Sequence, residues 1–324
     1  MTPGDDWRPS ADVEALHARA RLLAELRAFF SERGVLEVDT PVMAACGAAD
    51  PHLQNFVTHY HDPGATDAVP LYLQTSPEFA MKRLLAAGSG PIFQICKAFR
   101  NGERGRLHNP EFSLLEWYRP GLGYRALMDE VADLLARVGL GAATSTSYRE
   151  AFGNHVGVDP MAVEDAELRR LALQRGLHAG TAADDGRDTC LHYLWSHCVE
   201  PELGRAGPQF VFDFPSTQAM LARIRPGAVA VAERFELFVE GVELANGFQE
   251  LTDPVEQTRR FGQDNARRRS LGLAAVPPDT RLLAALAHGL PECSGVALGL
   301  DRLLLVLLGR SRLDEILAFP VHRA

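Results

Sequence analysis

Apolar residues recur at helical spacing near the beginning of the chain. The repeat falls within residues 11–33 and consists of Leu16, Ala20, Leu23 and Phe30. Steps of three, four and seven residues place side chains on one face of a helix, and Gly34 follows where a C-terminal cap is expected. The next segment, VLEVDTP, alternates apolar and polar residues until Pro41. The pattern therefore predicts a helix followed by a short strand.

A second helix is predicted from the residues that mark its ends. Ser76 and Pro77 are typical of a helix N-terminus, Glu78 suits the positive end of the helix dipole, and Gly88 ends the segment. The segments PIFQICKAFR and FSLLEWY have the composition of strands, and the polar connection between them is too long for a tight hairpin. Further helical patterns lie near residues 124–139, 163–175 and 188–199.

In the last third of the chain, strands follow one another directly. FVFDF, AERFELFVEG, VELANG and GVALGL have strand composition, and an arginine-rich helix is predicted after Asp253. Because strands and helices do not alternate regularly, we expect an α+β fold in which a mainly antiparallel β-sheet is flanked by helices. Neither an internal repeat nor a low-complexity linker divides the sequence, so we expect one domain over residues 1–324.

Composition excludes several classes of protein. The 324 residues are 46% hydrophobic and 23% charged, with a net charge of −9, which argues against disorder and against a broad nucleic-acid-binding surface. No apolar run reaches the roughly 18 residues of a membrane span, and the start, MTPGDDWRPS, does not resemble a secretory signal. Five scattered cysteines without a C-x-x-C pair indicate reduced thiols in a cytoplasmic protein without structural zinc.

One strand carries an acidic residue between aromatic ones. In FSLLEWY, alternation places Phe112, Glu116 and Tyr118 on one face, where an unpaired carboxylate is costly to bury. The strand is either an edge strand with Glu116 in water, or the floor of a pocket. In the pocket, Phe112 would stack on a flat group and Glu116 would hold a cation or polar ligand.

A second group of acidic residues lies in AERFELFVEGVELANGFQEL. If Glu240 and Gly241 form a two-residue turn, Glu236 and Glu243 lie on the same face one diagonal step apart. A divalent cation would relieve their repulsion, and oxygen ligands suit Mg²⁺. Glu250 follows downstream of a turn predicted at Asn246-Gly247. The alternative is a solvated charged face.

Arginines supply the complementary charge. Arg302 lies in the first turn of the predicted helix DRLLLVLLG, where it opposes the helix dipole unless an anion or a neighbouring carboxylate is close. Arg100 ends the strand PIFQICKAFR at the polar loop. Arginines for phosphates, carboxylates for Mg²⁺ and an aromatic ring for a base are the parts of a nucleotide site.

These segments resemble a known family. VLEVDTPVM, FRNGERGRLHNPEFSLLEWY and GVALGLDRLLL resemble motifs 1, 2 and 3 of the class II aminoacyl-tRNA synthetases, in that order. TSPE, HNPEF and ELANGFQEL resemble the lysyl branch rather than the aspartyl or asparaginyl branches. The resemblance starts at about residue 10, so we expect a catalytic core without the N-terminal anticodon-binding OB domain of lysyl-tRNA synthetases. This arrangement is similar to the stand-alone ligases that attach (R)-β-lysine to translation elongation factor P.

The resemblance implies a role for each matching residue. Arg100 would bind the α-phosphate of ATP and Arg302 its terminal phosphates, both as catalytic residues, and Phe112 would stack on adenine. The other expected ATP-binding residues are Asn101, Gly102, Glu103, Asn109, Glu243, Leu244 and Gly299. The expected amino-acid-binding residues are Ser76, Pro77, Glu78, Glu116, Tyr118, Asn246, Glu250 and Ala297. Mg²⁺ is expected on Glu236 and Glu243.

Two positions depart from the family pattern. Motif 2 usually reads Arg-Asn-Glu-Glu, but here Gly102 replaces the first glutamate, and we expect Glu103 to substitute for it through a loop shift. Ala297 stands where lysyl-tRNA synthetases have glycine. Its methyl group could reshape the pocket towards a β-amino acid.

The implied reaction forms an aminoacyl-adenylate from (R)-β-lysine, or lysine, and ATP. A lysine side chain of elongation factor P then attacks it, and tRNA is not expected as the acceptor. The alternatives are a minimal lysyl-tRNA synthetase-like enzyme with another acceptor and a non-catalytic regulatory paralogue. A homodimer is expected because Pro41 lies in motif 1. The five arginines between residues 259 and 269 predict a solvated helix face, or a surface that docks an acidic partner.

Overall fold

The computed structural model describes residues 7–64, 66–178 and 186–324. They fall into two compact units. Unit 1 comprises the chain up to Leu122 together with Leu251–Ala324, and unit 2 comprises Gly123–Glu250. The first six residues, which make up most of the acidic segment at the start of the chain, lie outside the described residues.

Unit 1 combines strands from both ends of the chain. Its helices are α1 (Val13–Glu32), α2 (Glu78–Ala86), α8 (Pro254–Ser270), α9 (Thr280–Gly289) and α10 (Leu300–Leu307), with a 3-10 turn at Leu313–Glu315. Its strands are β1 (Leu36–Glu37), β2 (Met43–Ala44), β3 (Val57–Tyr60), β4 (Val69–Leu73), β5 (Ile92–Phe99), β6 (Glu111–Pro120) and β12 (Cys293–Gly299).

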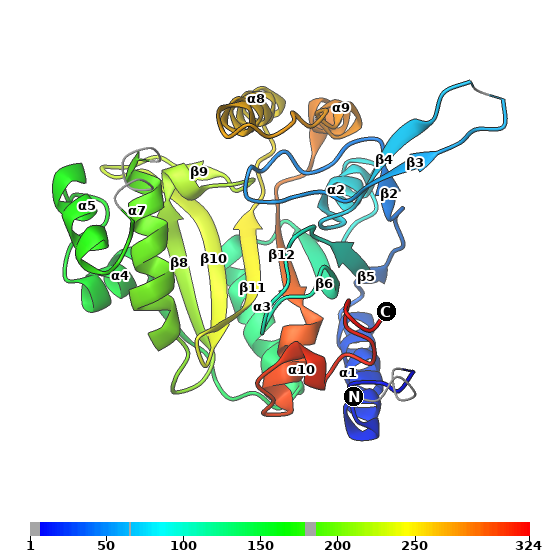
Figure 1. Cartoon of the computed structure of the whole chain (residues 1–324), viewed down its shortest axis with the longest axis horizontal. Coiled ribbons are helices and arrows are strands. Elements are labelled where there is room, and N and C mark those ends of the chain that lie inside the picture. The colour runs from blue at the N-terminus through cyan, green and yellow to red at the C-terminus, as the bar shows by residue number, and fades with distance from the viewer. Residues whose placement is uncertain (1–6, 65, 179–185) are drawn as a thin grey trace. The chain divides into compact units, whose positions relative to one another are not determined.

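Four strands of unit 1 lie side by side in the order β1, β5, β6, β12, and the last three are labelled in Figure 1. Strands β5 and β12 run antiparallel to β6 on its two sides, and β1 is parallel to β5. Because β6 is central in this group, it is buried continuously from Ser113 to Tyr118. The strand predicted over VLEVDTP is much shorter in the structure, because only Leu36 and Glu37 pair with β5.

Helix α1 packs its apolar face against this sheet. The ring of Phe30 stacks on that of Phe93 with 4.5 Å between centroids and meets Trp117 edge-on at 5.2 Å. All three side chains are buried. The helix begins after Asp12, whose side chain accepts a hydrogen bond from the backbone of Ala15. The helix predicted over residues 11–33 is thus confirmed within a residue or two at each end.

Strands β2, β4 and β3 form a separate small sheet in unit 1. Strands β3 and β4 make an arm that extends away from the rest of unit 1 in Figure 1. Tyr60 pairs with Val69 across the arm, and both side chains are about half exposed. The arm therefore carries apolar side chains that nothing in the described part of unit 1 covers.

The arginine-rich helix α8 is only partly a solvated face. Asp253 caps its N-terminus through the backbone of Val255, at 2.8 Å. Arg260 and Arg268 are buried, so the expectation of five solvated arginines is wrong for these two. The Arg268 guanidinium donates to the backbone carbonyls of Ala274 at 2.8 Å, Asp50 at 3.1 Å and Leu53 at 3.3 Å. It thereby holds the segment after β2 against the helix.

Unit 2 comprises a second set of helices and strands. Its helices are α3 (Tyr124–Arg137), α4 (Tyr148–Val156), α5 (Asp165–Gln174) and α7 (Gly186–Leu194), with shorter helical turns at Trp195–Val199, Glu200–Glu202 and Ser216–Gln218. Its strands are β7 (Thr144–Ser147), β8 (Gln209–Pro215), β9 (Ile224–Arg225), β10 (Val231–Val239) and β11 (Val242–Gln249). The strand order is β11, β10, β8, β7, with β9 beside β10. In both units most pairings are antiparallel, as expected.

The core of unit 2 is an aromatic cluster under its helices. Tyr148 stacks on Trp195 with 4.3 Å between ring centroids, and Phe214 packs against both rings. Helix α4, which carries Tyr148, was not predicted. The capping box of Ser147 and Glu150 at its start was the available signal.

The hairpin of β10 and β11 confirms one predicted turn and corrects another. Glu240 and Gly241 have φ of 53° and 73°, as a two-residue type I′ turn requires, and Phe238 pairs with Glu243. The turn predicted at Asn246-Gly247 is wrong. Both residues lie inside β11, where Gly247 pairs with Phe235. The neighbouring strand overrides the local turn preference of this dipeptide.

No helix in the described residues is both long and apolar enough to cross a membrane.

Candidate active site

The loop between β5 and β6 of unit 1 is held at several points. The Arg100 amide donates to the Pro110 carbonyl at 2.9 Å, and the Asn101 amide donates to the Gln54 carbonyl at 2.8 Å. Gly102 has φ of 81°, a left-handed conformation that strains any residue with a side chain. The glycine that replaces the family's glutamate therefore suits the path that this loop takes.

Arg100 presents an unused donor. Its guanidinium carbon lies 5.0 Å from the centroid of the Phe112 ring, and one terminal nitrogen lies 3.8 Å from a Glu103 oxygen. Its Nε is buried and has no hydrogen-bond partner among the described residues. A buried guanidinium donor without a partner is costly, so this atom is suited to an anionic ligand such as a phosphate oxygen. Glu103, proposed to replace the missing glutamate, faces Arg100.

Arg302, in the first turn of α10, contacts the same loop. Its Nε donates to the Leu107 carbonyl at 3.3 Å, and a terminal nitrogen lies 2.8 Å from Nε2 of His108. The preceding residue, Asp301, is buried, accepts a hydrogen bond from the Ser113 amide at 2.8 Å and forms an ion pair with Arg19. Unit 1 thus brings Arg100, Phe112 and Arg302 to one loop and its flanking elements.

Asn109, expected to contact the nucleotide, already has structural partners. Its amide nitrogen donates to the Glu111 carbonyl at 2.6 Å, and its oxygen accepts from the Val321 amide at 2.9 Å. These bonds tie the start of β6 to the C-terminal segment. Gly299, also expected at the nucleotide, is the residue at which β12 passes into α10.

A row of three residues crosses the sheet of unit 1. Gln94 on β5 pairs with Glu116 on β6, and Glu116 pairs with Ala297 on β12. Glu116 is 2% exposed, and the Tyr118 hydroxyl donates to its Oε1 at 2.6 Å. The alternative of an edge strand with Glu116 in water is therefore wrong. Ala297 therefore lies directly beside Glu116 on the neighbouring strand. The sequence alone did not reveal this pairing.

The segment at the start of α2 contributes a second carboxylate. Ser76 Oγ accepts from the Glu78 amide at 3.1 Å, and α2 starts at Glu78 directly after Pro77. The Lys82 ammonium lies 2.6 Å from Oε1 of Glu78. Lys82 was not among the predicted site residues, although the four-residue spacing from Glu78 was a visible signal.

In unit 2 the predicted Mg²⁺ ligands lie close to other charged side chains. Glu236 is buried and forms an ion pair with Arg234 from the same strand. Burial raises the pKa of Glu236 well above its ordinary value; Arg234 opposes this effect, and the carboxylates of Glu243 and Glu200 add to it. The expected repulsion between Glu236 and Glu243 is therefore present.

The other predicted residues of unit 2 lie on β11 or directly after it. The Asn246 oxygen accepts from Arg234 at 3.3 Å, and Asn246 pairs with Glu236 across the strands. Leu244 is buried at a register irregularity of the hairpin. Glu250 is buried and forms an isolated bridge with Ala222.

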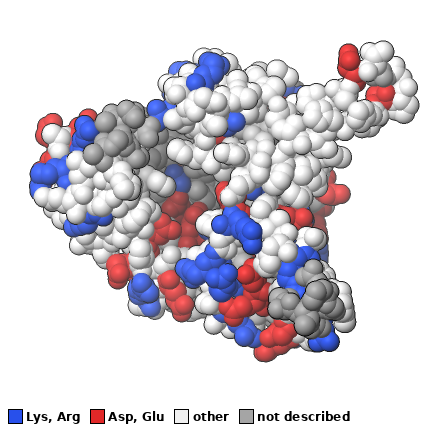
Figure 2. All heavy atoms as spheres, viewed as in Figure 1, with Lys and Arg blue, Asp and Glu red and all other residues white. Residues whose placement is uncertain are grey.

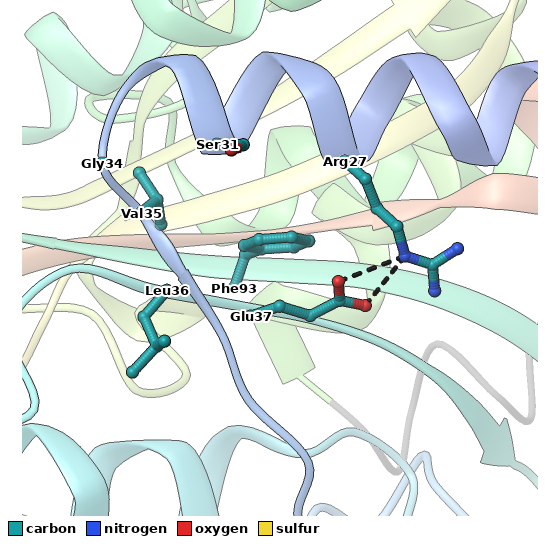
Figure 3. Close-up of a pocket in the computed structure, with 7 residues that line it drawn as sticks. All are labelled: Arg27, Ser31, Gly34, Val35, Leu36, Glu37 and Phe93. Carbon is teal, nitrogen blue, oxygen red and sulfur yellow. Dashed lines mark hydrogen bonds and ion pairs between the residues drawn. The ribbon is translucent and has the colours of Figure 1, made fainter.

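Unit 1 also has a surface pocket of about 550 Å³ where the end of α1 meets β1 (Figure 3). Figure 3 shows Arg27 and Glu37 at its mouth, joined by hydrogen bonds of 3.0 and 3.1 Å, and the ring of Phe93 at its side. None of the predicted site residues lines it. Both charged groups are about half exposed and satisfy each other, so nothing there calls for a ligand.

Comparison with known proteins decides the family. The model of the class II tRNA synthetases (D, K and N) matches residues 6–323. This chain belongs to that family. It is also 51% identical to the elongation factor P–(R)-β-lysine ligase of Pectobacterium atrosepticum and 52% identical to that of Edwardsiella ictaluri. Both alignments span 325 positions and cover the whole of each chain.

Membership of the class II synthetase family accounts for the fold. The mainly antiparallel sheet flanked by helices is the class II catalytic architecture, as the sequence motifs predicted. The family also implies use of ATP. The role of each candidate site residue stays a prediction.

Proposed function

We propose that this protein activates (R)-β-lysine, or lysine, with ATP and transfers it to a lysine ε-amino group of translation elongation factor P. The observation that carries the proposal is identity of about half of all residues, over the whole of both chains, to ligases named for this reaction. The catalytic domain is proposed to span residues 1–324.

The residues of unit 1 fit ATP. The buried Nε of Arg100, without a partner among the described residues, is suited to an α-phosphate oxygen, and the partly buried Phe112 ring beside it is suited to adenine. Arg302 is held by the loop through Leu107 and His108, which leaves a pre-oriented guanidinium for terminal phosphates. Glu103 is proposed as a nucleotide contact through its pairing with Arg100.

The carboxylates of unit 2 fit Mg²⁺. Glu236 and Glu243 repel each other when both are ionised, which raises the pKa of Glu236, and a bound cation would take the place of the proton that Glu236 holds. One or two carboxylates with substrate phosphates are the usual ligands of Mg²⁺. Three-residue clusters of His, Cys, Asp or Glu suited to a metal are absent from the described residues, so the phosphates would have to complete the coordination. When bound, Mg²⁺ neutralises phosphate charge.

The amino-acid substrate carries two ammonium groups, and the proposed contacts are acidic. Glu116, oriented by Tyr118, and Glu78, oriented by Ser76 and Lys82, are the acceptors in unit 1. Asn246 and Glu250 are the proposed contacts in unit 2. Ala297, opposite Glu116, is the proposed determinant of preference between α- and β-amino acids.

The chemistry needs positioning and charge rather than a covalent nucleophile. The substrate carboxylate attacks the α-phosphorus in line, the bond to the bridging oxygen breaks, and pyrophosphate leaves with its electron pair. Arg100 and Arg302 stabilise the charge that develops on the phosphates. The amine of the target lysine then attacks the adenylate carbonyl, forms an amide, loses a proton and releases AMP.

The test is a label-transfer assay with two acceptors in one reaction. The protein is mixed with ATP, Mg²⁺, elongation factor P and tRNA, and with either labelled (R)-β-lysine or labelled lysine. Label on the factor is the expected result. Label on tRNA would make this a minimal synthetase, and no label together with no pyrophosphate exchange would indicate a regulatory paralogue.

A homodimer in the cytoplasm is part of the same proposal. Exposed apolar side chains flank the motif 1 residue Pro41, namely Leu36, Val42 and Met43, and the arm of β3 and β4 adds Val57, Tyr60 and Val69. A second copy of the chain would cover them. Sedimentation velocity should give twice the chain mass, and Leu36→Glu with Met43→Glu should shift it towards the monomer.

A further inference from the structure

Lys82 is a charged residue placed where apolar residues usually lie. It is 1% exposed and follows the fully buried Met81 on α2. Leu85, one turn further along the same helix, is 2% exposed. An ammonium group in such surroundings is stable only when it is paired and hydrogen-bonded.

Its carboxylate partner is Glu78. The Lys82 ammonium lies 2.6 Å from Oε1, and glutamate four residues before lysine is the favourable order on a helix. The Glu78 side chain is 17% exposed, whereas that of Lys82 is 2% exposed. The lysine therefore lies deeper in the protein than the carboxylate that it holds, and the Glu78 side chain is still partly accessible.

The backbone of Glu78 is fixed as well. Its amide donates to Ser76 Oγ at 3.1 Å, at the point where the chain enters α2. With the backbone held by Ser76 and one carboxylate oxygen held by Lys82, the side chain has little freedom to change rotamer. A pre-oriented acceptor loses less entropy when it binds an ammonium group than a mobile one does.

We infer that Lys82 is a positioning residue that orients the Glu78 carboxylate towards an amino group of the amino-acid substrate. The inference rests on the proposed function, because Glu78 is a substrate contact only if the protein activates a lysine-like amino acid. Lys82 itself is too buried to touch the substrate and acts through Glu78.

The experiment is a double-mutant cycle measured by amino-acid-dependent ATP–pyrophosphate exchange. The four proteins are the wild type, Lys82→Met, Glu78→Gln and the double variant. We expect Lys82→Met to raise the KM for the amino acid about tenfold and to change the KM for ATP less than about twofold. In the Glu78→Gln background the same substitution should change the amino-acid KM less than about twofold, because the group it positions is gone.

The matched control is Arg83→Met, which removes a charge from the neighbouring, exposed position of α2. It should leave both KM values within about twofold of the wild type. An equal KM increase from Lys82→Met in both backgrounds would overturn the inference. So would an unchanged amino-acid KM accompanied by a lower melting temperature, which is the signature of a purely structural lysine.

Two further measurements cover the case in which Lys82→Met does not fold. Lys82→Gln keeps a donor towards Glu78 and should retain part of the amino-acid affinity. In the wild type, the ¹⁵N resonance of the Lys82 ammonium should shift when the amino acid binds, and not with ATP alone. An unmoved resonance would contradict the inference. A wild type inactive with every lysine-like amino acid would overturn the proposed function, and this inference with it.

Discussion

Buried and half-buried carboxylates occur in both units of this protein, but their surroundings differ. In unit 1, Glu116 accepts from the Tyr118 hydroxyl and Glu78 pairs with Lys82, so each carboxylate has a fixed partner. In unit 2, Glu236 has Arg234 beside it, yet Glu243 and Glu200 add negative charge around it. The same residue type thus supplies oriented acceptors in unit 1 and mutually repelling carboxylates in unit 2. Oriented acceptors suit ammonium groups, and carboxylates that repel each other suit a metal ion, which takes the place of the proton.

The largest expected effect concerns the two repelling carboxylates of unit 2, Glu236 and Glu243. Glu236→Gln and Glu243→Gln should each lower the pyrophosphate exchange rate at subsaturating Mg²⁺ by about 10²-fold, because each removes half of the charge proposed to hold the ion. Titration with Mg²⁺ should show a higher half-saturating concentration. Glu240→Gln, at the exposed turn of the same hairpin, is the control and should behave like the wild type. If all three variants have the same half-saturating Mg²⁺ concentration, the proposal that Mg²⁺ binds to unit 2 is wrong.

The next effect concerns the oriented acceptors. Glu116→Gln should raise the amino-acid KM about 50-fold, and Tyr118→Phe about tenfold, in line with hydrogen bonds to charged groups. Neither change should alter the Mg²⁺ titration. The comparison between the units breaks down if Glu116→Gln instead changes the Mg²⁺ requirement and leaves the amino-acid KM as it was.

A smaller effect is expected in the pH dependence of the stability of the folded protein. Burial raises the pKa of Glu236 from 4.5 to about 8, so the folded state holds a proton that the unfolded state releases. This contribution to stability is complete below the unfolded pKa and is lost as the pH rises through about 8. Without Mg²⁺, Glu236→Gln should therefore melt about 3 °C higher than the wild type at pH 8, with a smaller difference at pH 5. Calorimetry at pH 5 and pH 8 measures the difference in melting temperature between the variant and the wild type. The same difference at both pH values would contradict the raised pKa of Glu236.

The smallest effect is expected at the departure from motif 2. Glu103 lies 3.8 Å from Arg100 in an ion pair that is about one-third exposed, a contact worth little. Glu103→Ala should raise the KM for ATP about threefold if the residue helps to orient Arg100. An unchanged KM for ATP would show that Glu103 does not contact the nucleotide. No residue would then substitute for the motif 2 glutamate that Gly102 replaces.

Local sequence signals predicted many elements but failed where neighbours decide. The helix ending before Gly34 and the turn at Glu240-Gly241 were correct because cap and turn chemistry is local. The turn at Asn246-Gly247 was wrong because pairing with β10 keeps both residues extended. Within residues 141–208, helix α4 was missed although two local signals were present, namely its capping box and the helical spacing of its buried residues.

The candidate site shows the same division. Motif residues such as Arg100, Phe112 and Arg302 stand out by their type and order in the chain. That they meet at one loop depends on β5, β6 and α10 lying together, which no local pattern reveals. Lys82 was missed because a glutamate–lysine pair on a helix usually lies in water, and only burial distinguishes this pair from an ordinary one.

The sequence by itself determined the family, the α+β class and the residue types of the candidate site, because these depend on motif order and short-range chemistry. Tertiary structure alone decided that Glu116 is buried beside Ala297, that two arginines of α8 are buried, and that Lys82 lies behind Glu78. The physical reason is that burial and cross-strand pairing join residues distant in the chain. The energy of a charge depends on those neighbours far more than on its place in the sequence.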